Sequence, residues 1–112
     1  MLLQAKEIDG ITLVTINDQR LDANVAGEFK EQLGELIRRG HSVIALGMSQ
    51  VRFIDSSGLG AIVTCLKQLG TKGQIVVYDA GDSVRKLFSL TRMDKVFTLY
   101  PNQDAALAAF RD

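Results

Sequence analysis

Residues 53–60 read Phe53-Ile54-Asp55-Ser56-Ser57-Gly58-Leu59-Gly60, and the apolar run Ala61-Ile62-Val63 follows directly. The order of residue types predicts the end of a strand, a polar turn and the first turn of a helix. Asp and Ser side chains accept hydrogen bonds from the free N–H groups at a helix start. The stretch therefore predicts a strand-to-helix junction on which the rest of the chain is arranged.

Gly58 and Gly60 both fall in the first turn of this helix, where each glycine costs about 1 kcal/mol relative to alanine. Two such glycines indicate a close approach, either by another segment of the chain or by a partner's backbone or an anionic group. A helix start also favours negative charge, so a phosphate on Ser56 or Ser57 is compatible with the fold. From residue chemistry alone, helix capping is the simpler role for these serines.

Residues 53–60 resemble the signature of the STAS domain, the fold of bacterial anti-sigma factor antagonists. The likeness extends along nearly the whole chain, through Arg20-Leu21-Asp22-Ala23 and Val84-Arg85-Lys86-Leu87-Phe88. The resemblance implies that Ser56, the first serine of the Asp-Ser-Ser-Gly run, is a phosphoacceptor. The partner-facing surface that it implies consists of Asp22, Asn24, Asp55, Ser56, Ser57, Gly58, Leu59 and Gly60. At Gly47 the chain departs from the family, which usually has an acidic or amide residue near this point.

The length of 112 residues, 46% of them hydrophobic, fits one domain with one core over residues 1–112. Thirteen basic and 13 acidic residues give a formal net charge of zero without long runs of like charge, which argues against direct nucleic-acid binding. The start of the chain lacks the layout of a secretion signal. No apolar run approaches the roughly 20 residues of a membrane span. A cytoplasmic location without direct membrane contact is expected.

The periodicity along the chain predicts an α/β fold. Asp9-Gly10 separates two strands, Leu3–Ile8 and Ile11–Ile16, and is a favoured hairpin turn, so an antiparallel hairpin opens the fold. Further strands are expected at residues 43–46, 74–78 and 96–99, the first of them buried on both faces because it lacks alternation. Four helices are expected. Three start after Asp22, after Asp55 and after Asp82 or Ser83, and the fourth begins with Pro101 and Asn102. The result is a mixed sheet packed with about four α-helices, with parallel crossovers between the later strands.

Apolar residues at three- and four-residue spacing predict the inward face of each helix. The first face consists of Val25, Phe29, Leu33, Leu36 and Ile37. The second consists of Leu59, Ile62, Val63, Leu66 and Leu69. The third consists of Val84, Leu87 and Phe88. Two roles are open for Asp22, which precedes the first of these helices: a cap, or part of the surface beside Ser56 that the resemblance implies.

Cys65 is the only cysteine and His41 the only histidine. A single cysteine excludes an internal disulfide, and a reducing compartment suits it. Cys65 is interpreted as a small buried hydrophobe rather than a nucleophile, and His41 as a surface residue on a loop. A metal site would rest on carboxylates alone, so neither a metal nor a cofactor is predicted.

The function implied by the resemblance is that of a phosphorylation-controlled binding protein. The unphosphorylated chain would bind an anti-sigma factor that is also a serine kinase, and thereby free the sigma factor. That kinase, with its own ATP, would phosphorylate Ser56 and switch the binding off, and a serine phosphatase would reset it.

Two other functions are weighed against this one. An enzyme with Ser56 or Ser57 as nucleophile is disfavoured, because no histidine lies in a recognisable relation to the serines and no Gly-x-Ser-x-Gly elbow occurs. Use of Asp55 as an aspartyl-phosphate acceptor lacks the acidic pair that would hold Mg²⁺. The chain is therefore expected not to be an enzyme, without catalytic residues. The remaining alternative is a STAS-like adaptor subunit of a membrane transport complex that is never phosphorylated.

Overall fold

The computed structural model describes residues 1–111, and within them five strands form one mixed sheet. In spatial order the strands are β1 (Leu3–Ile8), β2 (Ile11–Ile16), β4 (Val43–Gly47), β6 (Gln74–Tyr78) and β7 (Leu99–Tyr100). β1 runs antiparallel to β2, and every other neighbouring pair is parallel. The predicted mixed sheet with parallel crossovers is confirmed.

The hairpin turn between β1 and β2 adopts the predicted geometry. Asp9 and Gly10 both have positive φ angles, 53° and 80°, as a two-residue turn that follows the twist of the strands requires. β1 forms one edge of the sheet and is mostly exposed, whereas β2 lies inside the sheet and is mostly buried.

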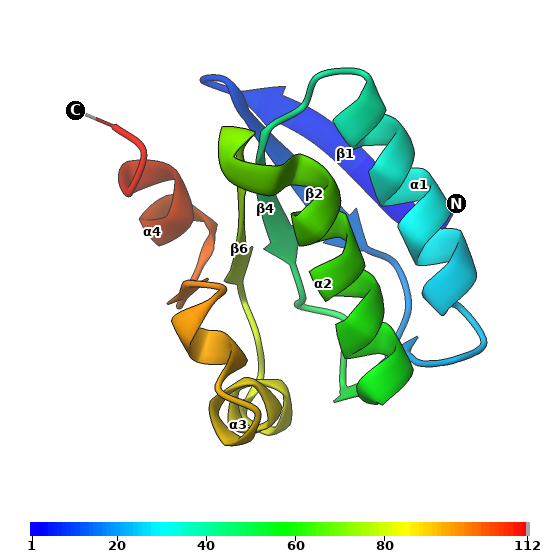
Figure 1. The fold of residues 1–112 in the computed structure, drawn as a ribbon. Helices are drawn as coiled ribbons and strands as arrows, with labels where there is room; N and C mark the ends of the chain where they lie inside the picture. Colours follow the sequence, from blue (N-terminus) through cyan, green and yellow to red (C-terminus); the bar gives the residue numbers. More distant parts are fainter. Residues whose placement is uncertain (112) are drawn as a thin grey trace.

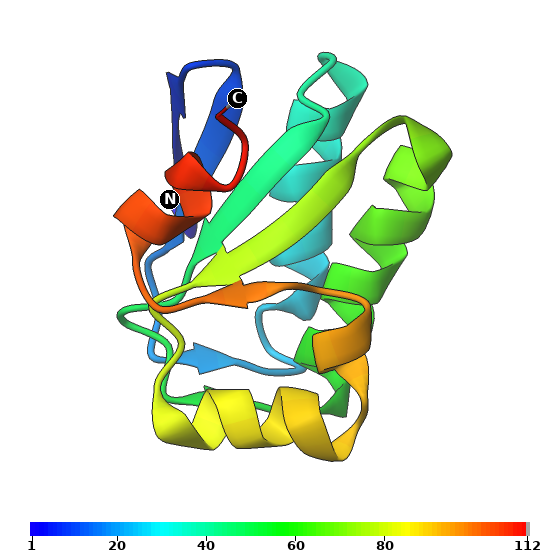
Figure 2. The same cartoon turned by 90° about the vertical axis from the view of Figure 1, so that its left-hand side faces the viewer.

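Four helices surround the sheet in the described part of the chain. α1 (Ala26–Arg38) and α2 (Ser56–Leu69) lie side by side on one face, and α4 (Gln103–Ala108) lies on the other (Figure 1, Figure 2). α3 (Asp82–Leu90) crosses one end of the molecule, next to a small parallel pair of strands, β3 (Arg20–Leu21) and β5 (Phe53–Ile54) (Figure 2). Short 3₁₀ helices, η1 (Gly70–Lys72) and η2 (Met93–Lys95), follow α2 and α3.

The sheet has apolar side chains on both faces. The larger core fills the space between the sheet and α1 and α2, and includes Val14, Ile16, Phe29, Leu33, Ile44, Leu46, Ile62, Phe88 and Phe97. A smaller core under α4 consists of Ile11, Leu13, Ala45, Val76, Tyr78, Ala106 and Leu107. β4 contributes to both cores, which confirms its expected burial on both faces.

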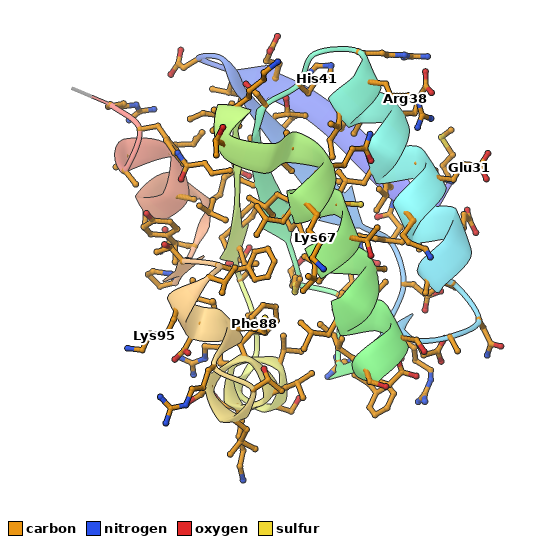
Figure 3. The ribbon with its side chains drawn as sticks, viewed as in Figure 1. Glu31, Arg38, His41, Lys67, Phe88 and Lys95 are labelled. Carbon is orange, nitrogen blue, oxygen red and sulfur yellow. The ribbon has the colours of Figure 1, made fainter. Side chains whose placement is uncertain are left out.

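Phe88 joins α3 to the larger core. Its ring points from α3 towards the sheet (Figure 3) and meets Phe97 edge-on, with 6.0 Å between the ring centroids. Phe97 was predicted to lie in a strand at residues 96–99. The strand instead begins at Leu99, because the chain turns through η2 and the Phe97 N–H donates to the Met93 carbonyl.

Two predicted helix caps are wrong. The residue before α1 is Val25 rather than Asp22, whose carboxylate is bound by Arg20 and by a backbone N–H instead. The residue before α3 is Gly81, and neither Asp82 nor Ser83 caps the helix. The helix expected to begin with Pro101 and Asn102 begins at Gln103 as α4, and Asn102 caps it: its side chain accepts a hydrogen bond from Ala105 N at 2.9 Å.

The predicted inward face of α2 is confirmed. Ile62 and Leu69 are buried, and Leu59, Val63 and Leu66 are half-buried and pack against the larger core. The most buried face also includes small residues that were not predicted there, Gly58, Ala61 and Cys65. Since small residues let a helix approach its neighbours closely, the first turn of α2 packs directly on the backbone of Leu21.

Candidate functional site

Asp55 caps α2, and the two serines that follow are left free. Its carboxylate accepts a hydrogen bond from Gly58 N at 2.9 Å. Ser56 and Ser57 are the first helical residues, and both are exposed. Neither hydroxyl is hydrogen-bonded to any of residues 1–111. The capping role that residue chemistry favours for the serines is thus taken by Asp55, and both hydroxyls face solvent at the positive end of the helix dipole.

The two glycines of the first turn have different surroundings. A Cβ atom on Gly58 would collide with the Leu21 carbonyl and lie 2.8 Å from its carbon. A Cβ atom on Gly60 would meet no atom within 4 Å. Close approach within the chain therefore explains Gly58. No contact among the described residues requires a glycine at position 60, which leaves a bare patch of surface one turn beyond Ser56.

The backbone of Leu21 brings the loop before α1 to the start of α2. Its carbonyl accepts a hydrogen bond from Asp55 N at 3.3 Å, and Leu21 pairs with Ile54 in the small sheet. Asp22 and Asn24 follow directly on this loop. The structure thus gathers the residues of the predicted partner surface in one region, although Gly58 is buried and Leu59 packs partly against the larger core.

Asp22 is held in place by two hydrogen bonds. Its carboxylate accepts from Arg20 Nε at 3.1 Å and from Asn24 N at 3.0 Å. The hydrogen bond from Arg20 is the main reason why the pKa of Asp22 lies below its usual range. The residue is only 8% exposed, so its role is to shape the loop that precedes α1 rather than to present a free carboxylate.

Arg20 links this loop to β5. While its Nε binds Asp22, the guanidinium lies 4.3 Å from the centroid of the Phe53 ring, a cation–π arrangement. Phe53 remains 41% exposed. Both residues lie in the stretches that carry the family resemblance, but neither was predicted as a site residue. No local sequence pattern predicts this contact, because it depends on the pairing of β3 with β5.

Gly47, where the chain departs from the family pattern, lies against the side chain of Tyr78. A Cβ atom on Gly47 would lie 2.6 Å from the Tyr78 hydroxyl oxygen and 2.7 Å from the ring carbon that carries it. Tyr78 is buried on β6, next to β4, and its ring lies over Gly47. Burial, followed by the nearby charge of Asp79, raises the pKa of the Tyr78 hydroxyl. The glycine thus makes room for the tyrosine ring.

The remaining reactive side chains lie away from the serines. Cys65 is buried in α2, and burial raises the pKa of its thiol to about 11. His41 lies near the far end of the molecule from α3 (Figure 3), and its Nδ1 is 2.7 Å from the Thr12 hydroxyl. His41 lies on a loop and is partly exposed, as predicted, and the hydrogen bond to Thr12 was not foreseen.

The described residues, 1–111, offer neither a cluster of metal ligands nor a membrane-spanning helix. No three His, Cys, Asp or Glu side chains are grouped as metal ligands would be in that part of the chain. None of the helices formed by the same residues has both the length and the apolar character needed to cross a membrane.

Comparison with known proteins identifies the family. The sequence profile of the STAS domain matches residues 3–106. The anti-sigma F factor antagonist of Paenibacillus polymyxa is 31% identical over 88% of this chain and 85% of its own length. BtrV of Bordetella bronchiseptica, named as a candidate anti-sigma factor antagonist, is 26% identical over 99% of this chain and 96% of its own length.

Comparison of the fold with solved structures also points to this family. The crystal structure of a candidate anti-sigma factor antagonist from Thermotoga maritima superposes with a TM-score of 0.91 at 27% identity, covering 98% of this chain and 95% of that chain. The chain therefore belongs to the STAS domain family, and the relatives it resembles here are named as anti-sigma factor antagonists.

Proposed function

We propose that this protein is an anti-sigma factor antagonist controlled by phosphorylation of Ser56. In the unphosphorylated form it binds an anti-sigma factor that is also a serine kinase, and the sigma factor is released. The kinase then transfers a phosphate from its own bound ATP to Ser56, and the complex dissociates. A serine phosphatase returns the protein to its binding form.

The single observation that carries this proposal is the free, exposed hydroxyl of Ser56 on a helix start that Asp55 already caps. Because capping does not use the hydroxyl, its modification removes no hydrogen bond to the rest of residues 1–111. The helix dipole and the free N–H groups of the first turn favour the added negative charge. The fold therefore tolerates both forms, as a reversible switch requires.

The switch acts through charge and size. A phosphate adds about −1.5 to −2 charges at neutral pH, beside the carboxylate of Asp55 and next to the bare surface at Gly60. A partner surface fitted to a small neutral hydroxyl would meet both electrostatic repulsion and steric bulk. The affinity falls while the antagonist keeps its fold.

This function requires no catalysis by the chain itself. The kinase supplies the nucleotide, so the protein needs neither a cofactor nor a catalytic residue. The partners are an anti-sigma factor with serine kinase activity and a serine phosphatase, without direct contact with nucleic acid or membrane. A cytoplasmic location fits these partners, because sigma factors act on RNA polymerase inside the cell.

The first experiment identifies the phosphorylated residue. Each serine-kinase anti-sigma factor encoded in the same genome is purified and incubated with ATP and the wild type, Ser56→Ala or Ser57→Ala. Intact-mass measurement should find one phosphate on the wild type and on Ser57→Ala, and none on Ser56→Ala. Hydroxylamine should leave the phosphate in place, because it cleaves an acyl phosphate such as one on Asp55 but not a phosphoserine.

The second experiment measures binding by the same purified partners. Ser56→Ala should bind as the wild type does, and Ser56→Asp should lose tight binding. Phosphate on Ser57→Ala alone, or tight binding by Ser56→Asp, would overturn the assigned switch. Recovery of a transport protein with no binding to any anti-sigma factor would favour the adaptor alternative instead.

A further inference from the structure

A groove of about 270 Å³ is lined by residues of β5 and α3. These two elements lie at the end of the molecule where α2 begins (Figure 2). Its walls carry apolar side chains, among them Phe53, Leu87 and Leu90. The Ser83 hydroxyl donates to the Arg52 carbonyl at 3.1 Å and ties α3 to β5. The two walls of the groove are thus joined by a hydrogen bond.

The apolar side chains of this groove are unusually exposed. Only four large hydrophobic side chains among residues 1–111 are exposed, namely Met1, Phe53, Leu90 and Val96. Two of these, Phe53 at 41% and Leu90 at 73%, line the groove. Apolar side chains gathered in a groove with a polar rim are typical of a protein-interaction site.

The rim of the groove is positively charged. Arg52 and Lys86 line it, whereas no aspartate or glutamate among the described residues does. Arg20, whose guanidinium lies over the Phe53 ring, adds no net charge because it is paired with Asp22. In a chain whose formal net charge is zero, this local excess of positive charge selects a partner segment that carries carboxylates.

We propose that the groove between β5 and α3 binds an acidic amphipathic segment of the anti-sigma factor, with its apolar side chains on Phe53, Leu87 and Leu90 and its carboxylates near Arg52 and Lys86. Because the occupant belongs to the partner assigned above, this assignment rests on the proposed function. Phe53 precedes Ser56 by three residues, so one partner can cover the groove and the serine together. Contacts in the groove provide affinity for the partner, and phosphorylation of Ser56 lowers that affinity.

The experiment measures the dissociation constant of the purified anti-sigma factor for the unphosphorylated chain by titration calorimetry. Leu90→Glu and Lys86→Glu place a carboxylate in the groove. Val96→Glu and Lys95→Glu are matched controls, since both control residues are exposed and neither lines the groove. Circular dichroism and thermal melting verify that all four variants fold, as expected for exposed positions.

Each groove variant should weaken binding by about tenfold or more, as loss of a central interface residue does, and each control should stay within about twofold. The affinity of the wild type should also fall with added salt, and that of Lys86→Glu should fall less. Groove variants that bind like their controls would overturn the groove assignment, while loss of binding in Ser56→Asp would leave the proposed function standing. If the unmodified wild type binds none of the anti-sigma factors, both are wrong.

Discussion

The backbone carbonyl of Leu21 occupies the space that a side chain at Gly58 would need. This contact fixes the first turn of α2 against β3, and it sets the position of Ser56 relative to the loop that carries Asp22. The start of α2 is thus positioned by packing between two segments far apart in sequence, not by the helix alone.

Gly58→Ala should destabilise the fold, because the added Cβ atom collides with backbone that cannot rotate away. We expect a loss of about 2 kcal/mol or more in the free energy of unfolding, at the upper end of overpacking effects. Urea denaturation of the two proteins measures it. Gly60→Ala is the matched control. It has open space and should stabilise the helix by up to about 1 kcal/mol, so equal effects at the two positions would contradict the packing account.

Gly47→Ala should also destabilise the fold, in this case through Tyr78. The added Cβ atom forces the buried tyrosine ring to move, at an expected loss of about 1–3 kcal/mol in the free energy of unfolding. In Tyr78→Leu the ring is absent, so Gly47→Ala should cost markedly less in that background. Denaturation of the two single variants and the double variant gives this coupling, and strictly additive losses would show that the two residues do not compete for space.

The stabilisation that Asp22 contributes should depend on pH. Its pKa is lowered in the folded protein, chiefly by the hydrogen bond from Arg20, so the native state favours the carboxylate. The contribution is complete above the ordinary pKa of an unfolded aspartate and is lost as the pH falls through the lowered pKa. The difference in unfolding free energy between the wild type and Asp22→Asn should be constant from about pH 7 to about pH 5 and shrink towards about pH 3.

The contribution of Asp22 is measured as the difference in unfolding free energy between the wild type and Asp22→Asn, so that the contributions of other titrating groups cancel. Glu35 also has a lowered pKa, because of Arg38, but it is present in both proteins. A difference that does not change with pH would show that the Arg20 contact does not favour the charged form of Asp22.

Cys65 should be inert in the folded protein. Burial raises the pKa of its thiol to about 11, so at about pH 8 only about one thiol in a thousand is ionised, and access is blocked as well. A thiol reagent such as dithionitrobenzoate should react slowly with the native chain and completely in denaturant. Rapid reaction under native conditions would contradict the buried position.

The sequence predicts those features that depend on neighbouring residues. The hairpin at Asp9-Gly10, the strands β2, β4 and β6 and a helix shortly after Pro101 follow from local turn and periodicity signals, and the structure confirms them. Asp22 was predicted as a cap of α1 or as part of the partner surface. It does not cap α1, because its carboxylate accepts from Arg20 Nε and from Asn24 N and the helix begins only at Ala26. The strand expected at residues 96–99 begins only at Leu99, because Phe97 belongs to the turn after η2 and its side chain is buried in the core.

At the candidate site, the sequence located the serines and glycines but could not separate their roles. Gly58 is explained only by the distant Leu21, whereas no contact among the described residues explains Gly60. The groove needs α3 to lie beside β5, a relation between elements that no local pattern encodes. The role proposed for Ser56 comes from the family resemblance, because residue chemistry alone left it as one of several.

The most direct test of the switch compares one chain in two states. The chain is phosphorylated to completion at Ser56 by its kinase, separated from the unmodified chain, and titrated with the same anti-sigma factor under non-turnover conditions. We expect the phosphate to raise the dissociation constant by at least about a hundredfold, because a dianion replaces a neutral group within an interface. Equal dissociation constants for the two forms would contradict the account.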